Sequence, residues 1–349
     1  MMSLDFQFLN VGHGDRTIVD FPDHLTVVDI NNCKTLAKES EEELRHKYTP
    51  PAPNPFLATY NTAGFILGGG LGGIQPPTGF AGIFARMAEA ERKLQLAKDK
   101  LTSPIDYLNA RFARRSIFRY IQTHPDMDHM AGIHRLTEDG IEIVNLWDTK
   151  HCIEKDDDAL RNANINKDIE DWHTYQRLRK STPNPTVLTL TAGAVGDYYT
   201  GDGIQIWAPF DHRHCLNPNA DPNALSYVLF IQVGACNIVL GGDATVETWE
   251  EIYKQRRGQF PKVHLLKASH HGRKSGYHRE SVKAMNPDVT ILSVGELKAK
   301  DDAESSYEKF STKDCYSTLD HGDIKATCYL DSEVFLYDRD GKFIARSWA

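Results

Sequence analysis

The alternation of apolar and polar residues predicts β-strands along most of the chain. The first thirty residues hold three alternating or β-branched segments, and the "PDH" between the second and third is typical of a hairpin turn. Later apolar segments also have the length and residue types of strands. The predicted strands are 4–10, 16–21, 25–30, 116–122, 141–149, 204–209, 226–234, 237–243, 263–269, 288–295, 324–330 and 333–341.

Helical spacing is expected between several of these strands. The segments are 39–47, 81–101, the start of a helix at 130–136, a mostly polar surface helix within 154–181, and helices at 245–257 and 278–285. A proline-rich break and a glycine-rich stretch, "GFILGGGLGGIQPPTGF", separate the first two helices. We therefore interpret 34–104 as an insertion within one α/β domain that spans 1–349 and has layered sheets flanked by helices.

Composition narrows the class of protein. With 40% hydrophobic and 25% charged residues, the chain has the balance of a globular protein. The net charge of −8 argues against general adhesion to nucleic acid or to anionic membranes. Local basic tracks remain at 111–119, 254–257 and 270–279.

The location expected from the sequence is cytoplasmic, without membrane contact. We find no secretory signal and no apolar run near the roughly 18 residues that span a bilayer. The six cysteines are scattered without C-x-x-C pairs, which predicts reduced thiols.

The stretch "QTHPDMDHMAG" at 122–132 concentrates two histidines and two aspartates where a strand meets a loop. Imidazole nitrogen and carboxylate oxygen are ligands of divalent metal ions. Two later strands end in similar donors, with Asp243 after "NIVLGG" and the pair His270 and His271 after "VHLLKAS". Because each donor follows an apolar strand, we expect one rim of a sheet to collect them.

These motifs together resemble the metallo-β-lactamase fold, a superfamily of metal-dependent hydrolases. The nearest resemblance is to the branch that includes the soluble domain of DNA-uptake competence channels. It rests on "VGHGD" (11–15), "THPDMDHMAG" (123–132), "GGDA" (241–244) and "SHHGRKSG" (269–276), and it covers roughly 4–33 and 116–330. The resemblance implies a four-layer αββα sandwich that carries the helical and glycine-rich insertion.

The resemblance also implies roles for individual residues around two divalent metal ions. In that assignment His124 and Asp126 face the first ion, and Asp128 and His129 face the second. Asp243 bridges the two ions, His270 completes the second site, and Asp29 supports the metal loop from behind.

Two positions depart from the superfamily pattern. Asp126 replaces the second histidine of the signature, and the isolated middle histidine has no clear counterpart. His212 and His214 are candidates to replace it. A ligand set shifted toward oxygen favours harder ions, so we hypothesise that manganese (or magnesium) competes with zinc.

A two-metal centre of this kind would lower the pKa of a bridging water and stabilise charge on a substrate oxygen. Asp128 is therefore a candidate catalytic residue as well as a ligand. His271 could protonate a leaving group or could simply pack against its neighbour.

Basic side chains next to the last histidines point toward an anionic substrate. Lys267, Arg273 and Lys274 are candidates to bind phosphate oxygens. Asn223 and Ser226, which lie where the middle histidine would fall, are further substrate-binding candidates.

The leading hypothesis is a two-metal phosphodiesterase or nuclease that acts on nucleic acid or a nucleotide. One alternative is a hydrolase of small esters, thioesters or lactones, which could use the same metals with a different pocket. The contrasting alternative is a non-catalytic module that binds a partner, for example in a defence system. A homo-oligomer is a further option. Phe80, Ile83, Phe84 and Met87 are expected to form the packing face of the insertion helix, with a lid or a dimer contact as the alternative.

Overall fold

Two β-sheets form the body of the protein. The computed structural model describes residues 3–32, 35–48, 80–113, 115–162, 169–211, 219–330 and 333–348. The larger sheet has nine strands in the order β15 (Phe343–Trp348), β14 (Glu333–Tyr337), β13 (Ile324–Tyr329), β1 (Ser3–Phe8), β2 (Thr17–Asp20), β3 (Leu25–Val28), β4 (Ile117–Ile121), β5 (Ile143–Trp147) and β6 (Thr186–Leu188). It is antiparallel from β15 to β3 and parallel from β3 to β6.

The second sheet has six strands and is also mixed. Its order is β12 (Asp314–Ser317), β11 (Val289–Leu292), β10 (Leu265–Lys267), β9 (Cys236–Leu240), β8 (Val228–Val233) and β7 (Ile204–Ala208). The strands β9 to β12 run parallel, and β7, β8 and β9 run antiparallel.

The helices flank these sheets or connect their strands. The α-helices are α1 (Lys38–Tyr48), α3 (Phe80–Asp99), α4 (Pro104–Phe112), α5 (Ile133–Glu138), α6 (Asp157–Asn162), α7 (Ile169–Arg179), α8 (Asp197–Thr200), α9 (Val246–Gln255), α10 (Arg279–Met285), α11 (Glu304–Glu308) and α12 (Thr318–His321). Short 3₁₀ turns are η1 (Met127–His129), η3 (Pro222–Leu225), η4 (Ser269–Gly272) and η5 (Lys274–Gly276).

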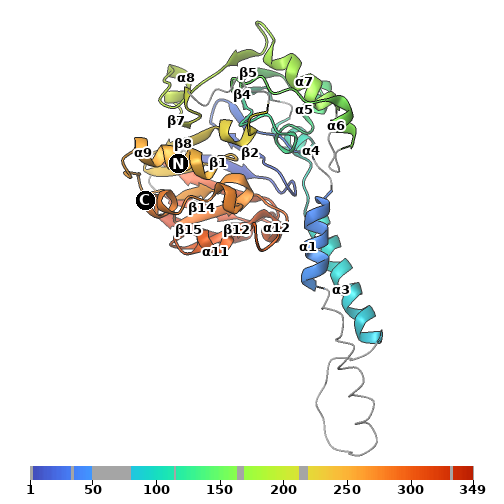
Figure 1. Cartoon of the computed structure of the whole chain (residues 1–349). Helices are drawn as coiled ribbons and strands as arrows, with labels where there is room; N and C mark the ends of the chain where they lie inside the picture. The colour runs from blue at the N-terminus through green and yellow to red at the C-terminus, as the bar shows by residue number, and fades with distance from the viewer. Residues whose placement is uncertain are drawn as a thin grey trace, which may run out of the picture.

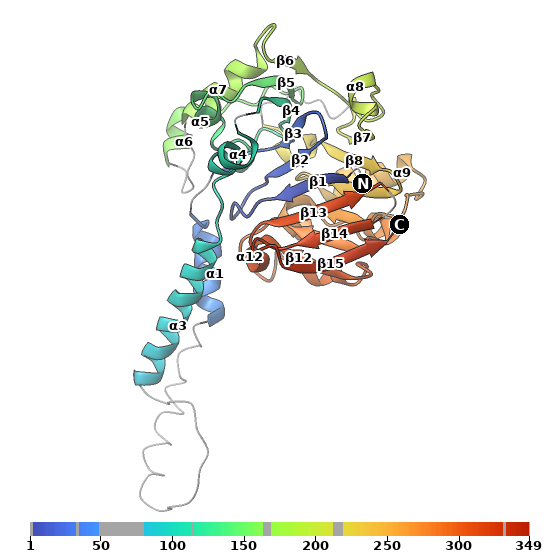
Figure 2. The same cartoon turned by 180° about the vertical axis from the view of Figure 1, so that it is seen from behind.

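Three apolar clusters show that the body has four layers. The first cluster lies between the sheets and combines Phe6 of β1 with Leu229 of β8. The second joins the outer face of the larger sheet to α4, α5 and α7, and the third joins the outer face of the smaller sheet to α9, α10 and α11. The arrangement is an αββα sandwich, as expected from the sequence (Figures 1 and 2).

Strand ends place the polar motifs at two neighbouring edges. In the larger sheet, β3 ends just before Asp29 and the parallel strand β4 ends just before "QTHPDMDH". In the smaller sheet, β9 ends just before "GGD" and the parallel strand β10 ends just before "ASHHG". Parallel neighbours bring their carboxyl ends to the same edge of a sheet, so chain direction gathers these motifs.

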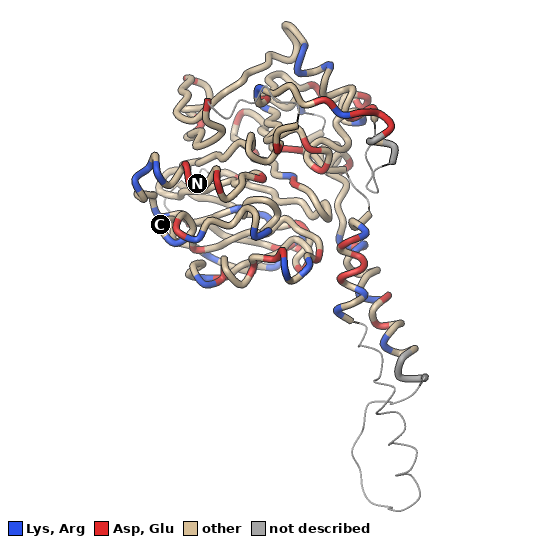
Figure 3. The backbone as a smooth tube through the Cα atoms, in the orientation of Figure 1, with Lys and Arg blue, Asp and Glu red and all other residues tan. Residues whose placement is uncertain are grey.

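Within the predicted insertion, α1 and α3 pair side by side and project from the body as an arm (Figures 1 and 2). Leu44, Leu94 and Ala97 are buried between the two helices. Ion pairs of Arg45 with Glu91 and of Lys98 with Glu41 cross the same contact, and Figure 3 shows both signs of charge along the arm.

Phe84 and Met87 of α3 are exposed, at 67% and 49% of their surface, so they contribute little to the packing of the arm. Most of the glycine-rich stretch predicted at 64–80 lies outside the described residues. The extent of the insertion and the single-domain organisation stay predictions.

Several elements differ from the sequence expectation. The strands β6, β12 and β15 were not predicted, and the segment 154–181 contains α6 and α7 rather than one polar surface helix. Helix α7 buries Trp172, Tyr175 and Leu178 against the larger sheet. The four cysteines of the described part, Cys152, Cys236, Cys315 and Cys328, are free thiols, as expected. None of the described helices combines the length and apolar character that a bilayer span requires.

The inter-sheet cluster gives a stability prediction. Phe6 is fully buried, whereas Phe343 at the sheet edge is 51% exposed. We expect Phe6→Ala to lower the free energy of unfolding by about 3–5 kcal/mol, because it leaves a cavity between the sheets. Phe343→Ala is the matched control and should cost less than about 1 kcal/mol. Urea denaturation of both variants measures the difference, and equal losses would contradict this assignment of the core.

Candidate metal centre

The carboxylate of Asp29 organises the loop that follows β4. Its Oδ1 accepts a hydrogen bond from the backbone N of Thr123 at 2.7 Å, and its Oδ2 accepts one from Thr123 Oγ1 at 2.7 Å. The same Oδ2 lies 2.8 Å from His129 Nδ1. With Nδ1 held in this way, the Nε2 atom of His129 is directed at the other sheet. These contacts are the ones that a residue supporting a metal-binding histidine would make, and the role of Asp29 stays a prediction.

Four side chains from both sheets converge in front of Asp29. Asp243 Oδ2 lies 3.2 Å from His129 Nε2 and 3.2 Å from His271 Nε2. His271 Nε2 also lies 3.5 Å from Asp128 Oδ2. The loop carrying Asp243 is fixed by Ser226, whose Oγ accepts a hydrogen bond from the backbone N of Asp243 at 3.2 Å. Ligand atoms at such spacings can share one divalent ion.

Asp15 is a fifth member of this group and was not assigned a role from the sequence. Its Oδ1 lies 3.4 Å from His271 Nδ1, and its Oδ2 pairs with the ammonium of Lys267. Asp15, His129, Asp243 and His271 are all buried, and their ligand atoms lie within 4.8 Å of one another. We call these four residues the buried cluster, together with Asp128, whose side chain is 27% exposed at its edge. Asp15 closes the quoted motif "VGHGD", which was the available signal for it.

Polar atoms without hydrogen bonds indicate that the buried cluster suits a metal ion. Within the described part of the chain, His129 Nε2, His271 Nε2, Asp243 Oδ1 and Asp15 Oδ1 are buried and make no hydrogen bond. Buried polar atoms normally have partners, because an unsatisfied one costs free energy. A mixed set of imidazole and carboxylate donors is what zinc and manganese bind.

The charges of the buried cluster shift its pKa values in opposite directions. Burial works to lower the pKa of His129, but the carboxylates of Asp243 and Asp29 outweigh it and raise that pKa well above its ordinary value. Burial works to raise the pKa of Asp243, but His271 and His129 hold it well below its ordinary range. Protonated imidazoles therefore neutralise the negative charge of the carboxylates. A bound metal cation would displace these imidazole protons.

His124 and Asp126 form a second group beside the buried cluster, which we call the outer pair. His124 Nε2 lies 3.7 Å from Asp126 Oδ2. This Nε2 atom of His124 is buried and makes no hydrogen bond to a described residue. Asp126 Oδ1 accepts a hydrogen bond from Lys155 Nζ at 3.0 Å. His212 and His214, the candidates for the missing histidine, lie outside the described residues.

The two adjacent histidines after β10 occupy different environments. His271 is buried within the cluster, and its Nδ1 lies 3.1 Å from the carbonyl oxygen of Ser293. His270 lies at the partly exposed edge, with Nε2 3.9 Å from Asp243 Oδ2 and Nδ1 2.8 Å from Ser275 Oγ. Both have left-handed backbones, with φ of 50° and 56°. The structure therefore brings His271 closer to the ligand position that the sequence assigned to His270.

The basic residues predicted to bind substrate lie in three different places. Lys267 is buried behind the cluster against Asp15. Arg273 lies beside it, with Nη2 3.3 Å from His13 Nε2 and 3.6 Å from Glu39 Oε2. Lys274 donates hydrogen bonds to the carbonyl oxygens of Ala299 and Lys300, on the surface.

Of the two polar residues predicted before β8, Ser226 is buried under Asp243, as described above. Asn223 lies in the η3 turn, where its backbone N donates to Asp221 Oδ1 at 3.0 Å. His13, near Asp128 and His271, is a further possible donor. Burial, together with the charge of His271, lowers the pKa of His13 to about 3, so its imidazole is neutral at neutral pH.

A buried hydrogen-bond network fixes the loop that carries Lys155. Asp148, which follows β5, accepts a hydrogen bond from the hydroxyl of Tyr175 at 2.5 Å and pairs with Arg179 at 2.8 Å. The hydroxyl of Tyr175 also lies 2.7 Å from His151 Nε2. Two residues on, the backbone N of Ile153 donates to His151 Nδ1 at 3.1 Å. The loop after β5 is thereby anchored to α7.

Comparisons with known proteins give no match by sequence and distant likenesses to solved structures. No family model matches the sequence, and no curated protein matches it. Among solved structures, the chain is similar to the metallo-β-lactamase fold protein YhfI from Bacillus subtilis, at 9% identity and a TM-score of 0.39 over 90% of this chain and 96% of that one. It is also similar to Igni18, a metallo hydrolase from the archaeon Ignicoccus hospitalis, at 10% identity and a TM-score of 0.41 over 90% and 94%.

A diphosphatase from the PhnP family is similar at 9% identity and a TM-score of 0.38, over 94% of this chain and 99% of that one. Likenesses at TM-scores this low support no conclusion about fold or activity. The fold class rests on the sheet order and the four layers described above.

The role of Asp29 predicts the effect of removing its charge. Asp29→Asn should weaken Mn²⁺ or Zn²⁺ binding by about 10–100-fold, because His129 loses the acceptor that orients its ring. Titration of the metal against a chelator of known affinity measures the change. Asp20→Asn is the control, since Asp20 pairs with Arg115 at the surface and should leave metal affinity unchanged. Equal affinity in wild type and Asp29→Asn would refute the supporting role.

The neutral state of His151 predicts a pH dependence of stability. Burial, followed by the charges of Arg179 and Lys155, lowers the pKa of His151 from 6.5 to about 3. Between these values only the unfolded chain binds the proton, so the stability present above pH 6.5 is lost as the pH falls toward 3. In His151→Gln, the free energy of unfolding should fall less steeply with decreasing pH than in wild type, by up to about 1.4 kcal/mol per pH unit.

Urea denaturation between neutral and acidic pH measures the slope. His173→Gln serves as the control, because His173 is 54% exposed in its side chain and pairs only with Asp157 among the described ion pairs. An unchanged slope in His151→Gln would show that this histidine is not held neutral.

Proposed function

We propose that this chain is a metal-dependent hydrolase that acts on phosphodiesters. The observation that carries the proposal is the buried cluster, in which atoms of Asp15, His129, Asp243 and His271 lie within 4.8 Å of one another. The Nε2 atoms of both imidazoles and one carboxylate oxygen each of Asp15 and Asp243 lack hydrogen bonds within the described part of the chain. Such a set of donors supports the binding of at least one divalent ion.

Asp128, His129, Asp243 and His271 would hold the ion, with Asp15 close to His271. A divalent ion supplies Lewis-acid activation of water and of a substrate oxygen. Manganese and zinc are both candidates, because the set is divided between oxygen and nitrogen donors.

The chain's own residues would orient the substrate and exchange its proton. Lys155 lies at Asp126 and Arg273 lies at His13, where they could contact phosphate oxygens. His270, at the exposed edge, is better placed than the buried His271 to exchange a proton with a leaving group. In this proposal the two histidines exchange the roles first assigned to them.

Basic side chains close to the centre favour an anionic substrate over a neutral lactone or thioester. The net charge of −8 in turn favours a nucleotide or a single strand in a defined groove over indiscriminate duplex binding. The motif resemblance to the soluble domain of DNA-uptake competence channels supports the same substrate class. A nuclease acting on single-stranded DNA is therefore the specific form of the proposal.

A substrate panel tests the proposal. Metal-loaded protein should cleave bis-p-nitrophenyl phosphate and single-stranded DNA, and should leave lactones and thioesters intact. Asp243→Asn should lower the phosphodiesterase rate by about 10³-fold or more, because Asp243 lies at the centre of the buried cluster. Asp314→Asn, at an exposed position of β12, is the matched control with an unchanged rate.

If the protein cleaves only lactones or thioesters, phosphodiesters are not its substrates and the proposal is wrong. Absence of hydrolysis by protein shown to contain metal would instead favour the partner-binding module.

A further inference from the structure

The outer pair differs from the buried cluster in how it is completed. Neither His124 nor Asp126 belongs to the groups of described residues that gather three or more metal-binding atoms. A cationic side chain already contacts the outer pair, since Lys155 Nζ lies 3.0 Å from Asp126 Oδ1. One carboxylate oxygen of the outer pair is therefore already engaged by a positive charge.

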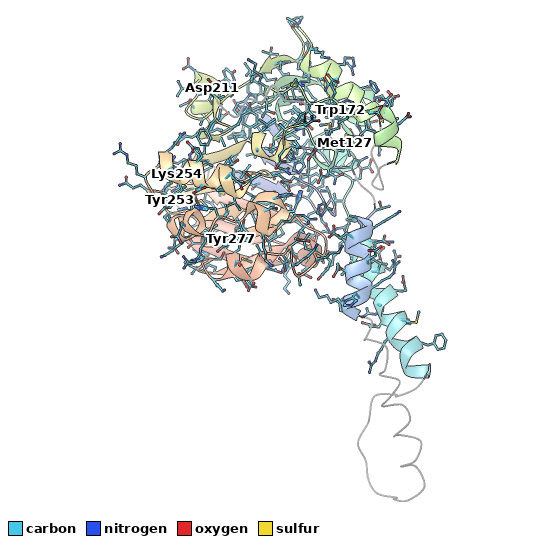
Figure 4. All side chains as sticks on the ribbon, viewed as in Figure 1. Met127, Trp172, Asp211, Tyr253, Lys254 and Tyr277 are labelled. Carbon is cyan, nitrogen blue, oxygen red and sulfur yellow. The ribbon has the colours of Figure 1, made fainter. Side chains whose placement is uncertain are left out.

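Lys155 is held in this position by a further contact. Its Nζ lies 5.6 Å from the centre of the Trp172 ring, a cation–π contact with the helix that packs on the larger sheet. Its side chain is only 20% exposed. Trp172 and Met127 belong to the apolar cluster on the outer face of the larger sheet, and both are labelled in the upper right of Figure 4.

The loop that carries Lys155 is also fixed. His151, four residues earlier, is bound to Tyr175 of α7, and Tyr175 and Arg179 hold Asp148 at the start of the loop. Few backbone torsions remain between these anchors and Lys155. An ordered lysine with a carboxylate partner is a fixed positive charge rather than a solvated side chain.

A divalent ion at the outer pair would meet this charge directly. It would have to bind Asp126 in competition with Lys155, and the two positive groups would repel each other across a few ångströms. In the buried cluster, Lys267 pairs with Asp15, whereas the carboxylates of Asp128 and Asp243 contact only histidines among the described ion pairs. The outer pair and the buried cluster therefore differ in how strongly a nearby lysine opposes the binding of a metal ion.

We propose that Lys155 takes the place of the second cation, so that the centre binds one divalent ion with a lysine ammonium beside it. The inference rests on the proposed function, because it assumes that the buried cluster binds metal. Lys155 then provides the positive charge that an anionic substrate oxygen would contact at the outer pair. It is a positioning residue for substrate and a determinant of metal number.

Metal stoichiometry tests the inference without reference to activity. Wild-type protein loaded with excess Mn²⁺ and desalted should retain one ion per chain by elemental analysis. Its electron paramagnetic resonance spectrum should show the hyperfine pattern of an isolated Mn²⁺ ion. Lys155→Met removes the charge and keeps the length of the side chain, so it should bind a second Mn²⁺ ion about tenfold or more tightly than wild type does. The spectrum should then show an exchange-coupled pair.

Two variants serve as controls. Lys155→Arg keeps the charge and should stay at one ion, whereas Lys150→Met removes an exposed lysine of the same loop and should also stay at one ion. Circular dichroism of each variant confirms that it is folded, and the wild-type and Lys155→Arg stoichiometries decide the matter should Lys155→Met not fold.

The outcomes separate this inference from the proposed function. Two tightly bound ions in wild type, or a single ion in folded Lys155→Met, would overturn the role of Lys155 while the metal-dependent function stands. No retained metal in wild type would overturn the proposed function itself.

Discussion

The burial of one carboxylate, that of Asp29, is the constraint on which the candidate centre depends. A charged group removed from water is stable only when its oxygens are fully engaged. Asp29 has 0% exposure, and its oxygens contact Thr123 N, Thr123 Oγ1 and His129 Nδ1. These contacts tie the end of β3 to the loop after β4 and direct His129 toward the other sheet. Were Asp29 free to turn, His129 and Asp243 would have no fixed separation.

Charge compensation extends outward from this point. Asp15 and Lys267 pair behind the cluster, although 252 residues separate them in the sequence, and Asp243 lies between His129 and His271. These charges have opposite neighbours, yet His129 Nε2, His271 Nε2 and Asp243 Oδ1 make no hydrogen bond within the described residues. Left-handed φ angles at Asp29, His270 and His271 add backbone strain at the same place. Strain of this kind persists only where the surrounding structure enforces it, and it is concentrated at functional sites.

Period-two patterns located most of the strands, because a strand with one buried face alternates apolar and polar residues. The sequence did not reveal β6, which has only three residues, or β12, whose "DCYS" has no apolar alternation. The misjudged segment is 154–181. Its charged residues indicated a solvated helix, but Trp172, Tyr175 and Leu178 lie three residues apart, and contact with the larger sheet buries them. A sparse apolar stripe is weak evidence until the surface that it meets is known.

By itself, the sequence determined an α/β class with layered sheets and the strand-end motifs, since these follow from local patterns and their order. The αββα class and most candidate ligands came from the resemblance that these motifs carry. The tertiary structure decided which of those residues lie together in the candidate metal centre. It brought His271 rather than His270 into the buried cluster, because two consecutive left-handed residues turn adjacent side chains in directions that no spacing reveals. It also added Asp15 and set Lys155 against Asp126, contacts between distant loops. Such contacts depend on the paths of both loops over the sheets, and no local pattern encodes them.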